Sequence, residues 1–408
     1  MIDIINDIKL EIQEQVLDIL RNMEDFEDEY VMQITEDLSY KNKKFKLLNY
    51  QEKKYVQSEI FHAIRRLDVL EALLSRENVS EIMINAYDEI YLEENGKISK
   101  SDVVFESNER YLDIIRQIVA KCNRSINGAN PIVDARLENG SRINVVLEPI
   151  SLNGTAVTIR RFSNKYLKME DLIRIGSITR EAADFLKKLV QAKYNIFICG
   201  GTGAGKTSFL NALSEFIPND ERIITIEDSA ELVLQDNGNL VSLETRNSNV
   251  GENLEITMRD LIKASLRMRP DRIVIGEVRG SECVDMLQAM NTGQEGSLST
   301  GHSNSAKDML TRLETMFLFG MDINPLTIKK QLMAIDIIIH IGRLRDKSRK
   351  VLEIVELEGL KDGEIIVRSL FSFEEEGEEK GIVNGKLKRK NPLLHRRKLE
   401  MAGIEIAT

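Results

Sequence analysis

The stretch YNIFICGGTGAGKTSFLNAL, Tyr194–Leu213, decides the fold of the larger part of the chain. Gly200, Gly205, Lys206 and Thr207 stand at the G-x-x-x-x-G-K-[ST] spacing of a phosphate-binding loop. An apolar run precedes the loop and an amphipathic pattern follows it, so we expect a strand, a tight turn and a helix. A chance match to so short a pattern would lack this context. The stretch therefore predicts nucleotide binding.

Each residue type in the loop has a chemical reason. Glycines let backbone N–H groups converge on phosphate oxygens, which a Cβ would obstruct. Lys206 supplies positive charge to the β- and γ-phosphates of ATP, the Thr207 hydroxyl ligates Mg²⁺, and the helix adds its positive N-terminal end. The predicted nucleotide-binding residues are the whole loop: Gly200, Gly201, Thr202, Gly203, Ala204, Gly205, Lys206, Thr207 and Ser208.

Carboxylates follow two further strand-like runs. RIITIEDSAEL places Glu227, Asp228 and Glu231 beyond one strand, and RPDRIVIGEVRG places Glu277 beyond another. A single acid in such a place is more often a helix cap or a solvated residue. Ligands of open α/β sheets lie outside the carboxyl ends of the strands, so we expect all four acids to converge on the phosphate loop. They are candidates for activating water and, for Glu227, for binding Mg²⁺.

His302 ends the strand-like run in STGHSNS. Its position on the nucleotide side predicts that it senses the γ-phosphate, although a lone histidine is usually structural. Spacing alone leaves both interpretations open. His62, His340 and His395 have no comparable context.

The pattern along 408 residues predicts two domains with appendages. Strand-like runs alternate with helical patterns over 194–345, which is typical of an α/β fold with a mostly parallel sheet. Asn95-Gly96 and Lys361-Asp362-Gly363 indicate hairpins, and the charged runs Glu374–Glu379 and Lys386–Lys398 indicate solvated surface. The expected parts are a helical appendage at 1–66, an α+β domain at 67–162, a linker at 163–179, an ATPase domain at 180–355 and a hairpin with a tail at 356–408. The expected strands of the ATPase domain are Asn195–Cys199, Arg222–Ile226, Arg272–Ile275, Gly296–Gly301 and Asp336–Ile341.

Composition limits the class of protein. The chain has 42% apolar and 30% charged residues and a net charge of −10, which disfavours nucleic acid as a partner. Its three cysteines are widely spaced, so we expect reduced thiols in a cytoplasmic protein and no zinc site. No apolar run approaches the ~18 residues of a membrane span, and the first residues do not resemble a secretory signal.

Together these motifs resemble the secretion and pilus ATPase superfamily of type II and type IV secretion and type IV pili. The resemblance covers roughly residues 67–360 through the phosphate loop GGTGAGKTS, the acidic motifs TIEDSAEL and RMRPDRIVIGEVRG, and the histidine box GSLSTGHSNS. LLSRENVSEIMINAYDEIYLEENGK, ARLENGSRINVVLEPISLNGTAVTIRRF and DMLQAMNTGQEGSLSTGHSNSAKDMLTRLETM look most like the CpaF-type ATPase of tight-adherence (Tad) pili. Gly301 and Ser303 depart from the aliphatic residue and the alanine that commonly flank the family's box histidine.

The resemblance implies a RecA-like motor domain behind a smaller N-terminal domain, in a homohexamer with nucleotide between the domains. By the same resemblance Glu231 is the water-activating base, Glu277 the second acid and His302 the box histidine. Guanidinium groups suit the charge of a transferring phosphoryl group. The family draws arginines of the N-terminal domain toward the nucleotide, and the matching positions are Arg142, Arg160 and Arg161.

The function expected is Mg²⁺-dependent ATP hydrolysis that drives pilus assembly, retraction or secretion. A motor without membrane spans would attach to the cytoplasmic membrane through a partner, which we expect to be an inner-membrane platform protein. One alternative is a RecA-like nucleic-acid translocase. Another is a nucleotide-gated scaffold that binds ATP and barely hydrolyses it.

Overall fold

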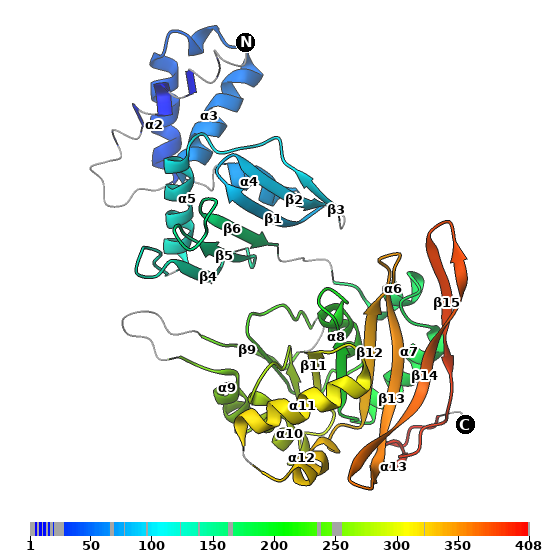
Figure 1. Ribbon diagram of the computed structural model, residues 1–408. Helices are drawn as coiled ribbons and strands as arrows, with labels where there is room; N and C mark the ends of the chain where they lie inside the picture. The colour runs from blue at the N-terminus through cyan, green and yellow to red at the C-terminus, as the bar shows by residue number, and fades with distance from the viewer. Residues whose placement is uncertain are drawn as a thin grey trace. The chain divides into compact units, whose positions relative to one another are not determined.

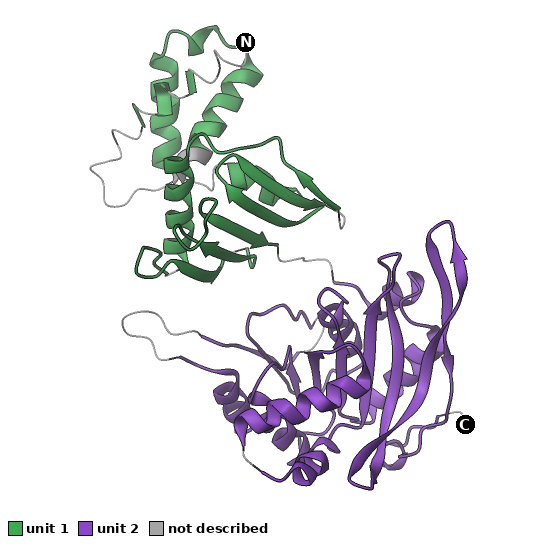
Figure 2. Ribbon diagram, viewed as in Figure 1, with its two compact units in different colours: residues 1–164 green, residues 165–408 purple. Residues whose placement is uncertain are grey.

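The computed structural model forms two compact units, residues 1–164 and residues 165–408 (Figure 2). The residues it describes are 5, 8–9, 11–13, 15–16, 19, 28–65, 69–76, 78–94, 97–122, 124–137, 139–161, 166–234, 238–246, 255–321 and 323–406. Over these residues, no helix combines the length and the apolar character that crossing a membrane requires.

Unit 1 begins with helices, as the sequence predicts for 1–66. Helix α2 (Asp28–Lys41) and helix α3 (Tyr50–Arg65) are joined by a turn that contains the 3₁₀ helix η1 (Phe45–Leu47). Apolar residues at three- and four-residue steps form one small core of their own. Its buried members are Ile8, Ile12, Val16, Val31, Ile34, Phe45, Val56 and Ile60.

The rest of unit 1 is an antiparallel sheet covered by a helix. The strand order is β3-β2-β1-β6-β5-β4, and helix α5 packs its apolar stripe (Ile114, Ile115, Ile118 and Val119) into the sheet's core. The Asn95-Gly96 turn lies outside the described residues, but Glu94 pairs with Lys97 as a hairpin requires. The elements are α4 (Val69–Ser75), β1 (Val79–Ala86), β2 (Glu89–Glu94), β3 (Lys97–Lys100), α5 (Asn108–Lys121), β4 (Ile132–Arg136), β5 (Arg142–Val146) and β6 (Ala156–Arg160).

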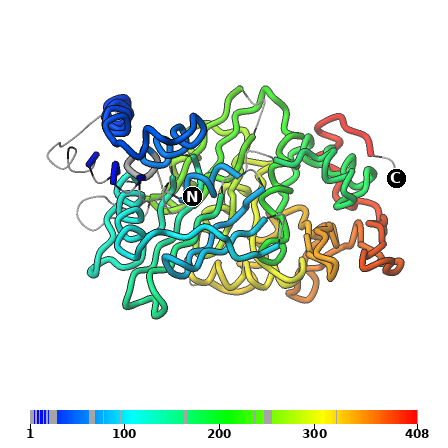
Figure 3. The backbone as a smooth tube through the Cα atoms, turned by 90° about the horizontal axis from the view of Figure 1, so that it is seen from above, coloured from blue at the N-terminus to red at the C-terminus, as the bar shows by residue number. Residues whose placement is uncertain are grey.

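The described residues of unit 2 form a sheet of nine strands in the order β15-β14-β13-β12-β7-β11-β10-β8-β9. Strands β12, β7, β11, β10, β8 and β9 run parallel to one another. Strands β13, β14 and β15 pair antiparallel at one edge of the sheet and are orange to red in Figure 3. All five predicted strands are confirmed within two residues at either end. They are β7 (Ile196–Gly200), β8 (Ile223–Glu227), β10 (Arg272–Ile275), β11 (Leu298–His302) and β12 (Ile337–Arg343).

Helices cover both faces of this sheet, the arrangement expected for a parallel sheet whose strands read as continuous apolar runs (Figure 1). One core contains residues of α6, α7, α8 and α13, and the other contains residues of α9 to α12. The helices are α6 (Met169–Arg174), α7 (Arg180–Gln191), α8 (Lys206–Ser214), α9 (Met258–Ser265), α10 (Glu282–Asn291), α11 (Ala306–Gly320), α12 (Pro325–Leu332) and α13 (Arg397–Met401).

The segment 163–179, predicted as a linker, contains helix α6. Met169 and Leu172 lie three residues apart, and both are buried in the core of unit 2. The polar residues around them give the segment the composition of a linker, yet this short apolar face suffices to pack. Strand β9 (Leu240–Glu244) was not predicted either, because only a few residues of alternating character mark it.

The C-terminal region forms the long strands β13 (Arg349–Lys361), β14 (Glu364–Glu379) and β15 (Ile382–Arg389). The predicted hairpin is confirmed, since Lys361 pairs with Glu364 and the turn residues Asp362 and Gly363 have φ of 53° and 79°. The two charged runs, predicted as solvated surface, are largely exposed but ordered. Opposite charges face each other across β14 and β15, for example Lys388 Nζ and Glu374 Oε2 at 2.8 Å.

A buried ion pair fixes the start of β10. Arg272 is fully buried, and its guanidinium donates to both carboxylate oxygens of Glu221 and to the Gly296 carbonyl. Gly296 has a φ of 79°, and a Cβ there would overlap the guanidinium. The buried charge therefore has a carboxylate partner and a backbone acceptor, and Gly296 leaves the space that the guanidinium occupies.

Glu221→Ala should destabilise unit 2 by about 3 kcal/mol, because it leaves the Arg272 charge buried without its partner. Urea unfolding followed by circular dichroism measures the change. Glu364→Ala is the matched control, since Glu364 pairs with Lys329 at the surface and its loss should change stability little. Equal stability of both variants would contradict the structural role of the buried pair.

Candidate functional site

The loop between β7 and α8 has the backbone that the glycine spacing predicts. At Gly200 a Cβ would lie 2.2 Å from the Ile341 carbonyl oxygen, so only glycine fits beside β12. Gly203 and Gly205 have φ of 70° and 95°, in the left-handed region that favours glycine. Gly205 is the N-cap residue of α8, so the N–H groups of the first turn face the concave side of the loop.

Lys206, the first residue of α8, folds its side chain back across the loop. Its Nζ donates to the carbonyl oxygens of Gly200 and Gly201 at 3.2 and 3.3 Å, and the residue is only 8% exposed. Burial lowers the pKa of this ammonium group, while the nearby Glu277 carboxylate acts in the opposite direction. Thr207 follows in the first turn and remains partly accessible.

A chain of polar contacts runs from Lys206 across three adjacent strands. Lys206 Nζ lies 3.1 Å from His302 Nδ1, and His302 Nε2 lies 2.6 Å from Glu277 Oε1. Arg279 donates to Glu277 Oε2 through Nε at 3.0 Å and Nη2 at 2.8 Å, and its Nη1 lies 3.7 Å from Asp228 Oδ2. The structure thus brings together Lys206, His302, Glu277 and Asp228 as the sequence predicts.

The protonation state of His302 follows from its neighbours. A lysine ammonium only donates, so Nδ1 must accept, which leaves the proton on Nε2, the nitrogen that faces Glu277. Burial lowers the pKa of His302, whereas the Glu277 carboxylate raises it and Lys206 and Arg279 lower it. The neutral imidazole therefore lies between the lysine and the acid at neutral pH, and it approaches Glu277 Oε1 closely without the geometry of a regular hydrogen bond.

Glu227 lies at the end of β8 and faces the protein interior. One carboxylate oxygen, Oε1, accepts the N–H groups of Glu231 at 2.9 Å and Leu232 at 3.0 Å. Burial raises the pKa of Glu227 to about 7. Gly276 makes room for this side chain, since a Cβ there would approach Glu227 Cγ to 2.9 Å. These contacts give Glu227 a positioning role in the turn that carries Glu231.

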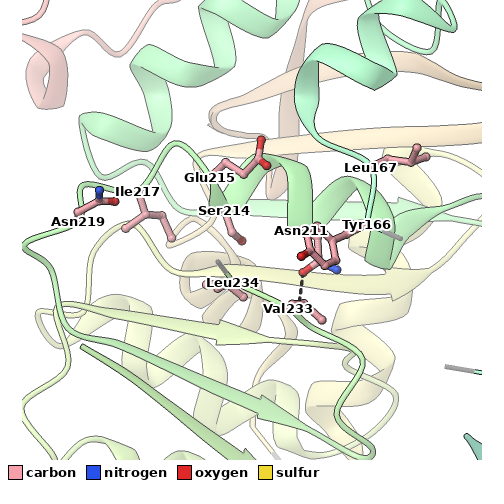
Figure 4. Close-up of a pocket in the computed structure, with 9 residues that line it drawn as sticks. All are labelled: Tyr166, Leu167, Asn211, Ser214, Glu215, Ile217, Asn219, Val233 and Leu234. Atoms are coloured by element: carbon pink, nitrogen blue, oxygen red, sulfur yellow. Dashed lines mark hydrogen bonds between the residues drawn. The ribbon is translucent and has the colours of Figure 1, made fainter. Parts of the chain in front are cut away.

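The segment after Glu231 is also attached to the helix of the phosphate loop. Asn211 on α8 accepts the N–H of Val233 at 3.0 Å. This contact lies at the side of a pocket lined by α8, the turn that follows it, this segment, Tyr166 and Leu167 (Figure 4). Glu231, which is partly exposed, is therefore held between β8 and α8. Its reach to a water molecule and the role of Glu227 toward Mg²⁺ stay predictions.

No three His, Cys, Asp or Glu side chains among the described residues are grouped so as to hold a metal ion. Magnesium in nucleotide sites is bound largely by phosphate oxygens and water, with one or two protein ligands. The Thr207 hydroxyl and the nearby acids are of the chemical type that fits this arrangement. Mg²⁺ thus remains a predicted cofactor that would bind together with the nucleotide.

The predicted arginines all belong to unit 1. Arg142 on β5 and Arg160 on β6 are cross-strand partners. Arg161 donates to the carbonyl oxygens of Val79, at 3.1 Å, and Arg76, and so ties the end of β6 to the start of β1. Their contact with nucleotide stays a prediction, and Arg161 has a structural role within its own unit.

Two arginines in unit 2 were missed by the sequence analysis. Arg279 stands two residues after Glu277 in the acidic motif RMRPDRIVIGEVRG, and this position could have indicated that it belongs to the site. Arg349, at the start of β13, donates from Nε to the Gly203 carbonyl at 2.8 Å. Nothing in the sequence indicates this contact, because the two residues are 146 positions apart.

Known proteins match the chain over most of its length. Residues 65–357 match the family described as Type II/IV secretion system protein. The putative conjugal transfer protein Rv3659c of Mycobacterium tuberculosis is 33% identical over 296 residues, which are 71% of this chain and 84% of that protein. The type IV secretion system protein PtlH of Bordetella pertussis is 32% identical over 325 residues, 72% of this chain and 95% of that protein.

Two solved structures share the fold. The ATPase DotB of Legionella pneumophila has a TM-score of 0.52 at 20% identity, with 72% of this chain and 80% of DotB covered. The pilus retraction motor PilT, solved with bound ADP, has a TM-score of 0.51 at 18% identity, with 82% and 86% covered. The predicted RecA-like domain behind a smaller α+β domain is confirmed, and the chain is an ATPase that belongs to the type II/IV secretion system protein family.

Proposed function

We propose that this chain is the motor subunit of a pilus or secretion machine, and that it works as a homohexamer with Mg²⁺. The contacts that join Lys206, His302 and Glu277 carry the proposal, because they connect a phosphate-binding lysine to an acid two strands away. A group that binds phosphate is thereby coupled to the proposed second acid of the site. A scaffold that only binds ATP would have no need for this coupling.

The geometry suggests how the residues divide the work. Lys206 and the N–H groups of α8 bind the β- and γ-phosphates, where charge accumulates during transfer. Mg²⁺, held by Thr207 and phosphate oxygens, would neutralise part of that charge. Glu231 is the proposed base that accepts a proton from the attacking water. Glu277, which accepts two hydrogen bonds from Arg279, is the proposed second acid.

His302 is the proposed γ-phosphate sensor. When a phosphate oxygen draws Lys206 Nζ away from His302 Nδ1, the imidazole loses a donor and its contact with Glu277 changes. The occupation of the loop is then communicated to β10 and β11 without movement of the backbone. The arginines of unit 1 would complete the site in the assembled ring, as the resemblance implies.

The proposed partner is a membrane platform protein, and the proposed location is the cytoplasmic face of the membrane. The family assignment and the relatives in type IV secretion and conjugal transfer support a role in such a machine. Tad pili remain the specific system that the motifs favour. Pull-down of the Lys206→Ala variant from membranes, with identification of the bound protein, tests this partner.

The RecA-like nucleic-acid translocase is the competing function. The net charge of −10 counts against it. Stimulation of ATP hydrolysis by DNA, with none by domains of a membrane partner, would favour it over the proposal.

Lys206→Ala and Glu277→Ala should each lower kcat for ATP hydrolysis by about 100-fold or more, because Lys206 supplies positive charge to the transferring phosphoryl group and Glu277 is the proposed second acid, which serves Mg²⁺ or water. Lys307→Ala and Glu181→Ala are matched controls at exposed positions of the same unit and should keep full activity. Phosphate release at saturating ATP measures the effect. Full turnover in either site variant would refute the assignment of its residue.

The rate of ATP hydrolysis should fall as the pH is lowered, and the midpoint of this fall should lie below the ordinary histidine pKa of about 6.5. The midpoint is low because the pKa of His302 is lowered. The rate falls because protonation of His302 at low pH would place a second cation beside Lys206. His302→Gln should lack this acid limb when kcat is measured from acid to neutral pH. An unchanged limb in the variant would assign the titration to another group.

A further inference from the structure

The turn between α2 and α3 concentrates positive charge in an acidic chain. Residues 40–55, YKNKKFKLLNYQEKKY, which we term the α2–α3 tip, contain six lysines and one acid, Glu52, whereas the whole chain has a net charge of −10. The α2–α3 tip precedes residue 65, where the match to the family begins. The functions proposed above make no use of it.

The backbone of the α2–α3 tip is held in a defined shape. Asn42 Oδ1 accepts the N–H groups of Lys44 at 2.9 Å and Phe45 at 3.1 Å. Asn49 and Glu52 bond reciprocally through side chain and backbone, both at 2.9 Å, which caps the start of α3. The one carboxylate of the segment is thus used locally, and the lysines are presented by a preformed turn.

Large apolar and aromatic side chains surround the lysines and point outward. Phe45 is fully buried and anchors the turn, whereas Leu47 is 88% exposed. Tyr50, Tyr55 and Tyr40 are 80%, 55% and 51% exposed. The small core of the helices does not include these four residues, although the Tyr40 ring packs edge-on against Phe45 with ring centroids 5.9 Å apart. Folding alone therefore does not explain a protruding leucine with Tyr50 and Tyr55 exposed beside it.

The exposed lysines lie on the same short segment as Leu47. Lys41, Lys43, Lys44, Lys46 and Lys54 are exposed, and Lys53 is partly so. Lys44 has an exposed acidic neighbour, Glu11, at 3.8 Å, a separation at which water screens most of the attraction. In Figure 1 the turn lies at one end of the α2–α3 pair. The chain continues into α4 from the opposite end of this pair.

We propose that the α2–α3 tip binds the surface of an anionic lipid bilayer. Lysines are attracted to a negatively charged leaflet, tyrosine rings suit the headgroup region, and an exposed leucine gains free energy by entering hydrocarbon. Lysines and tyrosines alone would also fit nucleic acid. Leu47 decides for lipid, because an aliphatic side chain gains nothing from phosphate.

This surface would give the chain a membrane contact of its own, independent of a partner protein. A single leucine with a basic cluster binds reversibly, since stable anchoring needs more buried hydrocarbon. Several copies in a ring would strengthen the attachment by multivalency. The inference goes beyond the proposed motor function and holds or fails separately from it.

Co-sedimentation of the full chain with vesicles tests the proposal. The chain should bind vesicles of phosphatidylcholine mixed with phosphatidylglycerol, but not phosphatidylcholine alone, and added salt should weaken binding. The triple variant Lys43→Gln, Lys44→Gln, Lys46→Gln and the single variant Leu47→Ser should each lose about tenfold in affinity.

Matched variants in unit 1 separate the α2–α3 tip from general surface properties. Leu152 is also 88% exposed, so Leu152→Ser makes the same change elsewhere, and Lys97→Gln with Lys100→Gln removes charge from the exposed strand β3. Both controls should bind like the unchanged chain, and circular dichroism and ATPase activity should be the same in all variants. Equal binding to neutral vesicles, or undiminished binding by Leu47→Ser, would overturn the proposal. Binding to DNA oligonucleotides without binding to vesicles would also overturn it and assign the α2–α3 tip to nucleic acid.

Discussion

The parallel pairing of β7, β11, β10 and β8 is the constraint on which the site depends. Because these strands are neighbours and run in one direction, their carboxyl ends meet at one edge of the sheet. Gly200 is in register with His302, so the phosphate loop begins beside the histidine. Along the edge, Glu277 follows the next strand, β10, and Glu227 is the last residue of the strand after it, β8. Residues separated by about a hundred positions thus form one cluster without any loop having to reach across the fold.

Electrostatics then sets the state of the cluster. Positive and negative groups alternate from Lys206 to Asp228, with a neutral imidazole between the first cation and the first acid. Burial disfavours the charged forms of Lys206, His302 and Glu227, each in the direction expected for its type. The alternation limits this cost, because each charged group has a partner of opposite sign or a neutral acceptor. A phosphate that enters the loop would compete for Lys206 and disturb the whole chain of contacts.

The sequence predicted those parts of the site whose pattern lies within a short stretch of consecutive residues. The phosphate loop and β10 were predicted closely, since glycine spacing and short apolar runs between turn residues specify them. Helix α6 and strand β9 were missed, because their apolar residues are few and their surroundings polar. Arg349 beside Gly203 and the backbone contacts of Glu227 depend on tertiary structure, which no spacing in the sequence reveals. For Glu227, its position at the end of a strand suggested a metal ligand, which stays a prediction, and its contacts add a positioning role that the sequence did not indicate.

The central claim is that Lys206, His302 and Glu277 act as one connected unit that responds to phosphate. A cryo-electron microscopy structure of the chain with ADP, Mg²⁺ and aluminium fluoride tests it most directly. The account predicts that Lys206 Nζ leaves the carbonyl oxygens of Gly200 and Gly201, contacts the fluoride, and changes the contact between His302 and Glu277. A structure in which the loop is occupied while Lys206 keeps these carbonyl bonds and its 3.1 Å contact with His302 would contradict the claim.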